Sequence, residues 1–347
     1  MVITMLMEFP PNSAVLRQTA ICALLLVSVA LPCFLIYRVA DSLPFRPSRA
    51  PHVFTTSDDD LFPSDSEEYS LEKVLMDASM PDKSVILTTL NGAWAAPNSI
   101  VDLFLESFRI GKHTRRLLDH LVIVSLDQKA FSRCLVVHPH CFALVSEGVD
   151  FSHEAYFMTP DYLKMMWRRI DFLRSVLEMG YNFVFTDADV MWFRDPFPDF
   201  HPDVDFQIAC DHFSGSAEDL EYNIPNGGFN FVRSNNRSIE FYKFWYSSHV
   251  TYPGLHDQDV LNRIKNDTFV REIGLKMKFL DTALFGGFCE PSRDLEQVCT
   301  MHANCCLGLE SKLHDLRILL EDWKRYLSLP PSLKPFESWR VPQNCSS

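Results

Sequence analysis

The sequence predicts an α/β protein with a mixed, largely parallel central sheet. Between residues 84 and 186, short apolar, β-branched runs alternate with stretches of helical periodicity. This alternation is typical of βαβ units, in which successive strands lie parallel. Each run ends in polar residues, as expected where the carboxyl ends of parallel strands form a ligand-binding edge.

The first two predicted strands are the runs SVILTTLN at residues 84–91 and HLVIVSLD at residues 120–127. A helical pattern separates them, which favours parallel pairing. Thr88 and Asn91 lie toward the carboxyl end of the first run. We therefore take both as candidate ligand-binding residues at the edge of the sheet.

A helix is predicted between Thr159 and Gly180. Thr159 suits an N-cap, a proline and an aspartate follow it in the first turn, and Gly180 stands where a helix commonly stops. The apolar residues between them follow helical spacing and give one buried face. Lys164 and Arg168 lie four positions apart near the edge of that face, so they share a side of the helix. They form either a solvated basic edge or an anion-binding pair.

The helix leads into a third strand, YNFVFTDADVMWF at residues 181–193, which Asp187 and Asp189 interrupt. Buried carboxylates are costly unless they are paired or bind a metal. In an extended chain, two residues separated by one project to the same side, so these carboxylates can share one ion. Hard cations such as Mn²⁺ or Mg²⁺ prefer oxygen ligands of this kind. A pair of turn aspartates is the alternative.

Three other D-x-D patterns occur, at residues 58–60, 203–205 and 257–259. The first lies in an acidic stretch and is expected to be solvated. The second precedes its apolar run, so it is expected in a turn at the entry of a strand. Only the pattern at residues 187–189 directly follows a strand-like run, which places it at the ligand-binding edge.

The composition suits a folded protein and disfavours a nucleic-acid partner. The chain has 347 residues, of which 47% are hydrophobic and 22% charged, with a net charge of −13. It contains no Lys/Arg stripe with interleaved aromatic residues that would bind phosphate backbones. The uncharged run at residues 19–37 is close to the ~20 apolar residues that cross a bilayer. A cleaved signal peptide, the alternative, has a shorter apolar core.

These patterns divide the chain into five predicted segments. They are a cytoplasmic tail (1–18), a transmembrane signal anchor (19–37), a stem rich in Ser, Asp and Pro (38–82), a folded domain (83–328) and a C-terminal tail (329–347). Eight of the ten cysteines and three N-glycosylation sequons follow the anchor. Both features favour an oxidising lumen, although the arginines after the span oppose that orientation. The cysteines are expected to form disulfides of undetermined pairing, and a zinc site is disfavoured.

Several motifs in a fixed order resemble a known enzyme family. PNGGFNFVRSN at residues 225–235, HDQDVLN at 256–262 and MHANCCLGL at 301–309 follow the strand that ends in D-x-D. This order resembles the nucleotide-diphospho-sugar transferases. FTDADVMWFRDPF, GGFCEPSRDL and HANCCLGLESKLHDL resemble plant glycosyltransferase family 77 more closely. The resemblance covers residues 84–327, and implies a GT-A fold and retaining transfer of a sugar from a UDP-sugar.

The resemblance implies three metal-site residues. Asp189 would be the principal metal ligand, Asp187 would bind the metal, a metal-bound water or the ribose, and His302 would be the third protein ligand. A histidine in the hydrophobic core is the alternative for His302. His314 is the rival ligand, but its helical pattern favours an exposed position on a helix.

The resemblance also implies residues that bind the donor and residues that act at its anomeric carbon. Those near the sugar and diphosphate would be Asn226, Gly227, Gly228, Asn304, Gly308 and Lys312. Those beside the anomeric carbon would be Asp257, Gln258 and Asp259. A tight turn at 226–228 and a helix N-terminus at 257–259 are the local alternatives. Related families space the histidine, glycine and lysine more closely, as H-x-x-G-x-x-K, which puts the roles of Gly308 and Lys312 in doubt.

The function implied is that of a single-pass type II Golgi membrane glycosyltransferase dependent on Mn²⁺ or Mg²⁺. Its donor would be a UDP-sugar, with a pentose such as arabinose or xylose expected, and its acceptor a cell-wall polysaccharide or glycoprotein. Covalent and front-face routes to retention both stay open. The alternatives are a catalytically inactive, membrane-anchored sugar-binding or scaffold protein and a metal-dependent phosphohydrolase, which would need more clustered His and Asp residues.

Overall fold

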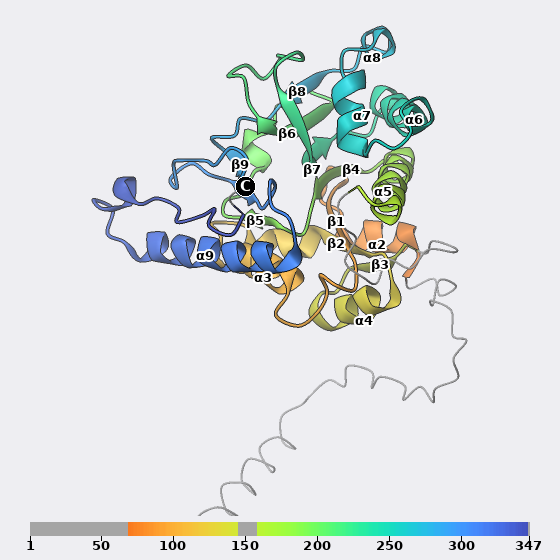
Figure 1. The fold of residues 1–347 in the computed structure, drawn as a ribbon. Coiled ribbons are helices and arrows are strands. Elements are labelled where there is room, and N and C mark those ends of the chain that lie inside the picture. The colour runs from red at the N-terminus through yellow and green to blue at the C-terminus, as the bar shows by residue number, and fades with distance from the viewer. Residues whose placement is uncertain (1–68, 145–157, 346–347) are drawn as a thin grey trace, which may run out of the picture. The chain divides into compact units, whose positions relative to one another are not determined.

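Two sheets form the centre of the molecule, seen in the computed structural model, which describes residues 69–144 and 158–345 (Figure 1). All of these residues belong to one structural unit. The larger sheet contains, in spatial order, β3 (Cys141–Ala143), β2 (Leu121–Ser125), β1 (Ser84–Leu90), β4 (Asn182–Thr186), β7 (Ile224–Val232), β6 (Phe206–His212) and β8 (Met277–Phe279). The smaller contains β5 (Val190–Trp192), β10 (Thr300–His302) and β9 (Phe285–Gly287).

The larger sheet is mixed and largely parallel, as the sequence predicted. Strands β3, β2, β1 and β4 pair in parallel. Strand β7 is antiparallel to both of its neighbours, β4 and β6, while β8 pairs with β6 in parallel. The carboxyl end of β4 therefore lies beside the middle of β7, where Asp187 N–H donates to the carbonyl of Gly228 over 2.7 Å.

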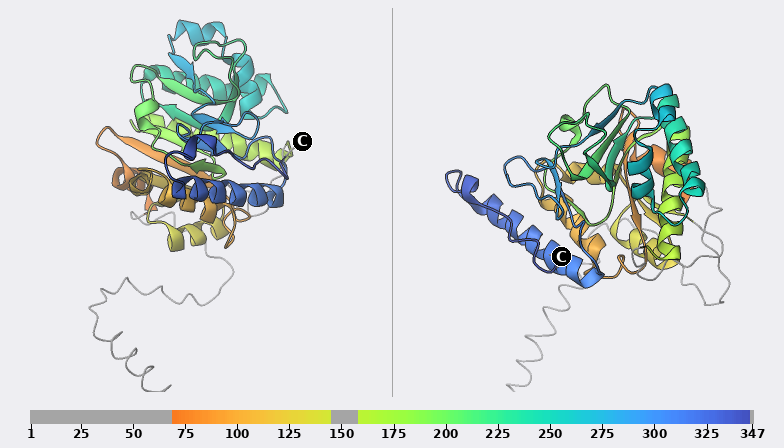
Figure 2. Two further views of the ribbon diagram at one scale, coloured as in Figure 1. Left: turned by 90° about the vertical axis from the view of Figure 1, so that its left-hand side faces the viewer. Right: turned by 45° about the horizontal axis from the view of Figure 1, so that its top comes forward.

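Helices cover both faces of the larger sheet (Figure 2). One face packs against α2 (Leu71–Ala78), α5 (Pro160–Glu178), α6 (Asn236–Thr251), α7 (Asp257–Ile264) and the short α8 (Thr268–Glu272). The other packs against α3 (Ile100–Ile110), α4 (Gln128–Val137), α9 (Leu309–Ser328) and the smaller sheet. Because both faces are covered, the central strands read as continuous apolar runs. In β1, Val85 and Leu87 face the first layer and Ile86 and Leu90 the second.

The helix predicted from residue 159 is α5, and its local signals act as expected. Thr159 is the N-cap and its hydroxyl accepts from Tyr162 N–H. Gly180 follows the helix with φ of 85°, a conformation that glycine adopts without the steric cost of a Cβ. The chain then enters β4, which carries it to the D-x-D.

The predicted limits of the folded domain were wrong at both ends. Helix α2 lies in the region assigned to the stem, and it buries Val74 and Leu75 against the sheet. The region assigned to the C-terminal tail also packs onto the body, with the Trp339 ring 5.3 Å from that of Phe193. Asp315 of α9 holds this segment by accepting three of its backbone N–H groups.

Six of the eight cysteines that were expected to pair form disulfides. These are Cys134–Cys141, Cys289–Cys305 and Cys306–Cys345. Cys210 and Cys299 are buried free thiols. The predicted anchor at 19–37 and the D-x-D at 58–60 lie outside the described residues. Within the described part of the chain, every helix is too short or too polar to cross a membrane.

Candidate active site

Three predicted metal ligands meet at the carboxyl end of β4. Asp187 and Asp189 follow that strand, and His302 ends β10, which pairs antiparallel with β5. His302 Nε2 lies 3.1 Å from Asp189 Oδ1 and 4.0 Å from Asp187 Oδ2. One ligand atom from each residue falls within 4.8 Å of the others, so the three can bind one ion.

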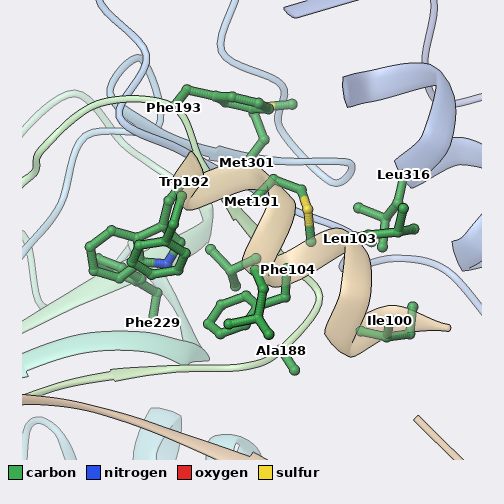
Figure 3. Close-up of a cluster of buried hydrophobic side chains, with 14 of the residues drawn as sticks. Ile100, Leu103, Phe104, Ala188, Met191, Trp192, Phe193, Phe229, Met301 and Leu316 are labelled. Carbon is green, nitrogen blue, oxygen red and sulfur yellow. The ribbon is translucent and has the colours of Figure 1, made fainter. Parts of the chain in front are cut away.

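The residue between the two aspartates belongs to the hydrophobic core, whereas the carboxylates on either side of it approach His302. Ala188 is buried in the core cluster that includes α3, beside Phe104 (Figure 3). Residues 187–190 form a turn, in which Val190 N–H donates to the carbonyl of Asp187 over 3.1 Å before the chain enters β5. The turn alternative therefore holds for the local backbone, and this turn carries both aspartates to His302.

The residues present fit a hard divalent cation. Asp189 is almost completely buried, and its Oδ1 faces His302 Nε2 at 3.1 Å without a well-aligned hydrogen bond. A ligand between these two atoms would satisfy the buried oxygen. The triad packs directly against the backbone of Gly228, because a Cβ there would lie 2.7 Å from Asp187 Oδ2 and would also overlap His302.

Lys312 stabilises the charged form of Asp189. Its ammonium lies 2.5 Å from Asp189 Oδ2 and 2.9 Å from the carbonyl of Ala303, and it stands over the ring of Trp94, 5.5 Å from the ring centroid. Burial by itself would raise the pKa of Asp189, but Lys312 and then His302 overcome this and lower it. Asp189 is therefore an ionised ligand. The longer spacing between His302 and Lys312 does not keep this lysine away from the site.

Arg169 links the metal triad to the second acidic motif. Its guanidinium donates to Asp187 Oδ1 over 2.9 Å and to Asp257 Oδ2 over 2.6 Å, and it stacks over Phe185. Burial raises the pKa of Asp187, with Arg169 as the main opposing influence. At Asp257 burial also acts to raise the pKa, but Arg169 and His256 together outweigh it and lower the pKa.

The sequence analysis missed Arg169 and chose its neighbour. Lys164 and Arg168 lie on the exposed side of α5, near Asp161 and Asp171 of the same helix, outside the contacts that join the triad. A signal was present, because Arg169 falls between Met166 and Leu173 on the apolar face of α5. A charged residue in that position needs a buried partner.

A network of amide side chains lies next to the triad, centred on Asp211 at the end of β6. Asp211 Oδ1 accepts from Asn226 Nδ2 and Asn304 Nδ2, and its Oδ2 accepts from Gln258 Nε2, each over 2.7 Å. Gln258 Oε1 accepts from Gly227 N–H over 2.9 Å. Asp211 was not predicted, since nothing in its local sequence marks it. The predicted Asn226, Gly227 and Gly228 lie within β7, so the turn alternative is wrong.

The three residues of the 257–259 motif have different surroundings. Asp257 begins α7 and is buried against Arg169, and its Oδ1 receives no hydrogen bond from the described residues. Asp259 is half-exposed and lies 3.3 Å from His256 Nε2. His256 is the N-cap of α7, so the helix-terminus interpretation holds as well.

The remaining predicted residues have their own local contacts, which the structure describes one by one. Thr88 is buried in β1, and its Oγ1 has no hydrogen-bond partner in the described chain. Asn91 follows β1 and accepts from Trp94 N–H over 3.1 Å. Gly308 precedes α9 with φ of 84°. His314 is half-exposed and contacts Asp315, as expected for the rejected ligand.

A family model described as nucleotide-diphospho-sugar transferase matches residues 116–316, which include the triad, Arg169 and Lys312. The chain belongs to this family. A protein of Arabidopsis thaliana that is described as uncharacterized is 54% identical to this transferase over 79% of this chain and 73% of its own length. An A. thaliana UDP-D-xylose:L-fucose α-1,3-D-xylosyltransferase is 22% identical over 62% of this chain and 65% of its own length.

These relatives confirm the resemblance of this transferase to plant glycosyltransferase family 77 and its α/β, GT-A-like fold. Among solved structures, mouse xyloside xylosyltransferase 1 aligns with a TM-score of 0.39 and 13% identity over 64% of this chain and 98% of that chain. So low a score bears on neither fold nor function. The family and the triad together indicate a nucleotide-sugar donor and a metal site of unassigned ion.

Proposed function

We propose that this transferase is a retaining, metal-dependent enzyme that moves a pentose, arabinose or xylose, from a UDP-sugar to a cell-wall glycan or glycoprotein. The observation that carries the proposal is the triad of Asp187, Asp189 and His302, backed by Lys312, in a chain of the nucleotide-diphospho-sugar transferase family. The relative named as a xylosyltransferase supports a pentose donor.

The residues of the site suit the departure of UDP from a sugar. The triad would hold Mn²⁺ or Mg²⁺, which neutralises negative charge that develops on a leaving diphosphate. Lys312 keeps Asp189 ionised for that task and adds a positive charge of its own. Asp257, held by Arg169, and Gln258, held by Asp211, would lie beside the sugar and stabilise its positive charge.

We also propose a location in the Golgi lumen, with residues 19–37 as a type II anchor. Three disulfides in the folded domain support an oxidising compartment. Two sequons support it as well, since Asn236 and Asn266 are both exposed. Glycosidase treatment of the protein made in plant cells, followed by gel mobility, tests this: unchanged mobility and fractionation away from Golgi markers would refute it.

Release of UDP from a panel of UDP-sugars, with and without Mn²⁺, tests the proposed activity. UDP-xylose, UDP-arabinofuranose, UDP-galactose and UDP-glucose cover the pentose and hexose donors. We expect metal-dependent turnover that is fastest with a pentose. An equal rate with hexoses would refute the pentose assignment, and no metal-dependent turnover with any donor would favour an inactive sugar-binding protein.

Asp189→Asn is the diagnostic variant for the same assay. It keeps the shape of the side chain but removes the charge of the ligand, so we expect turnover to fall at least ~100-fold. Asp203→Asn is the matched control, because Asp203 belongs to another D-x-D and is exposed. Equal activity of the two variants would show that the triad is not the metal site.

A further inference from the structure

The loop at residues 303–308 connects the third metal ligand to Lys312 and is crosslinked twice. Cys305 is bonded to Cys289, which follows β9, and Cys306 is bonded to Cys345 near the C-terminus. These two consecutive cysteines thus join the loop to two different parts of the fold. This loop accounts for the longer spacing between His302 and Lys312 in this chain than in the H-x-x-G-x-x-K pattern.

The first of these disulfides lies against the side chain of Asn304. Asn304 Oδ1 accepts from Cys289 N–H over 3.1 Å, and Asn304 Nδ2 donates to Asp211 Oδ1 over 2.7 Å. The Asn304 carboxamide also packs tightly against the backbone of Gly287, since a Cβ at Gly287 would overlap all the terminal atoms of the carboxamide. One N–H of Asn304 has no acceptor among the described residues, so it remains available to a ligand.

The backbone at the disulfide adds a second observation. Cys305 has φ of 50°, in the left-handed region that side-chain-bearing residues seldom occupy. Such a conformation persists when the surrounding structure holds it in place. Here the crosslink to Cys289 supplies that restraint, and Cys289 Sγ lies 3.4 Å from Asp211 Oδ1, at the centre of the amide network.

We propose that the Cys289–Cys305 disulfide is a positioning element of the donor site. It fixes the Asn304 carboxamide so that its remaining N–H donates to the bound nucleotide-sugar, and it holds the segment that carries His302. This inference rests on the proposed function. It predicts that loss of this disulfide weakens nucleotide binding in a chain that still folds.

The test compares two double variants of the full chain. Cys289→Ala with Cys305→Ala removes the positioning disulfide. Cys134→Ala with Cys141→Ala is the matched control, because it removes a disulfide that joins α4 to β3. Strand β3 is at the edge of the larger sheet, with three strands between it and β7. Both variants are expected to have a lower Tm, since each loses a crosslink.

Binding of UDP in the presence of Mn²⁺, measured by titration calorimetry below both Tm values, separates positioning from stability. We expect the Kd for UDP to rise about tenfold in the Cys289/Cys305 variant and to stay within about twofold in the control. A Kd within about twofold of the unaltered chain in both variants, or an equal rise in both, would overturn the proposal.

Hydrogen exchange without nucleotide distinguishes this inference from the proposed function. Peptides that cover residues 302–306 should exchange faster in the Cys289/Cys305 variant than in either the unaltered chain or the control. If the unaltered chain binds no UDP, the proposed function fails, and faster exchange then still shows that the disulfide orders this segment. Unchanged exchange would refute the positioning role itself.

Discussion

Replacing Gly228 by alanine should disable the metal site without unfolding the protein. The new Cβ would lie 2.7 Å from Asp187 Oδ2 and nearer than 3.0 Å to the His302 ring. To reach the ~3.5 Å of an ordinary contact, each ligand would have to retreat by roughly 1 Å. Neither moves easily, because Arg169 holds Asp187 and β10 pairs with two strands at His302.

A displacement of about 1 Å at a reacting site can lower a rate ~100-fold, or by about 2.7 kcal/mol in transition-state stabilisation. We therefore expect kcat/KM with the preferred UDP-sugar and saturating Mn²⁺ to fall about 100-fold in Gly228→Ala, and the apparent affinity for Mn²⁺ to fall with it. Steady-state UDP release over a Mn²⁺ series measures both.

Gly227→Ala is the matched comparison for this prediction. A Cβ at Gly227 would meet no atom nearer than 3.5 Å, so the side chains around it need not shift. We expect its loss of kcat/KM to be at least about ten times smaller than that of Gly228→Ala. Equal losses, or an unaltered Mn²⁺ dependence in Gly228→Ala, would refute the view that the metal ligands need the close approach that Gly228 allows.

Two further predictions concern stability. Arg169→Met leaves the buried carboxylate of Asp257 and the partly exposed one of Asp187 without their shared cation, so the free energy of unfolding should fall by roughly 3–5 kcal/mol. Arg168→Met, on the exposed side of α5, should cost under about 1 kcal/mol. Urea unfolding measures both. Burial lowers the pKa of His138 to about 4, so the free energy of unfolding should decrease as the pH falls from about 6.5 toward 4.

The sign at His138 follows from its lowered pKa in the folded state. The unfolded chain binds the proton near pH 6.5 and the folded chain only near pH 4, so acid favours unfolding, by up to roughly 3 kcal/mol. His138→Gln should therefore lose less stability than the unaltered chain between pH 7 and pH 4.5. The same loss of stability with acid in both proteins would contradict the His138 prediction. Equal urea midpoints of the Arg169→Met and Arg168→Met variants would contradict the Arg169 prediction.

The strands and the D-x-D were predictable because they depend on local patterns. The apolar run before the aspartates needs no distant partner to be interpreted, and β4 confirms it. The single strand expected over 181–193 was wrong, because a turn at 187–190 takes the chain from β4 into β5 of the other sheet. The position of His302 was reached through a resemblance of motifs, since only the pairing of β10 with β5 brings it to Asp189.

Residues that act through long-range contacts were not predictable in the same way. Asp257 is 88 residues from Arg169, and Asp211 is 93 residues from Asn304. On α5 the sequence analysis named Arg168 instead of Arg169. Consecutive residues on a helix point about 100° apart, so a shift of one residue separates the exposed side from the buried one. The ends of the folded domain were missed because α2 is only eight residues long and the segment after residue 329 buries only a few side chains.

Diffraction from crystals soaked with Mn²⁺ and UDP tests the central claim most directly. The account predicts an anomalous manganese peak in contact with Asp187, Asp189 and His302, with the diphosphate of UDP bound to the same ion. Nucleotide bound elsewhere, or manganese held by other residues while the triad stays in its ion-paired arrangement with Lys312, would contradict it.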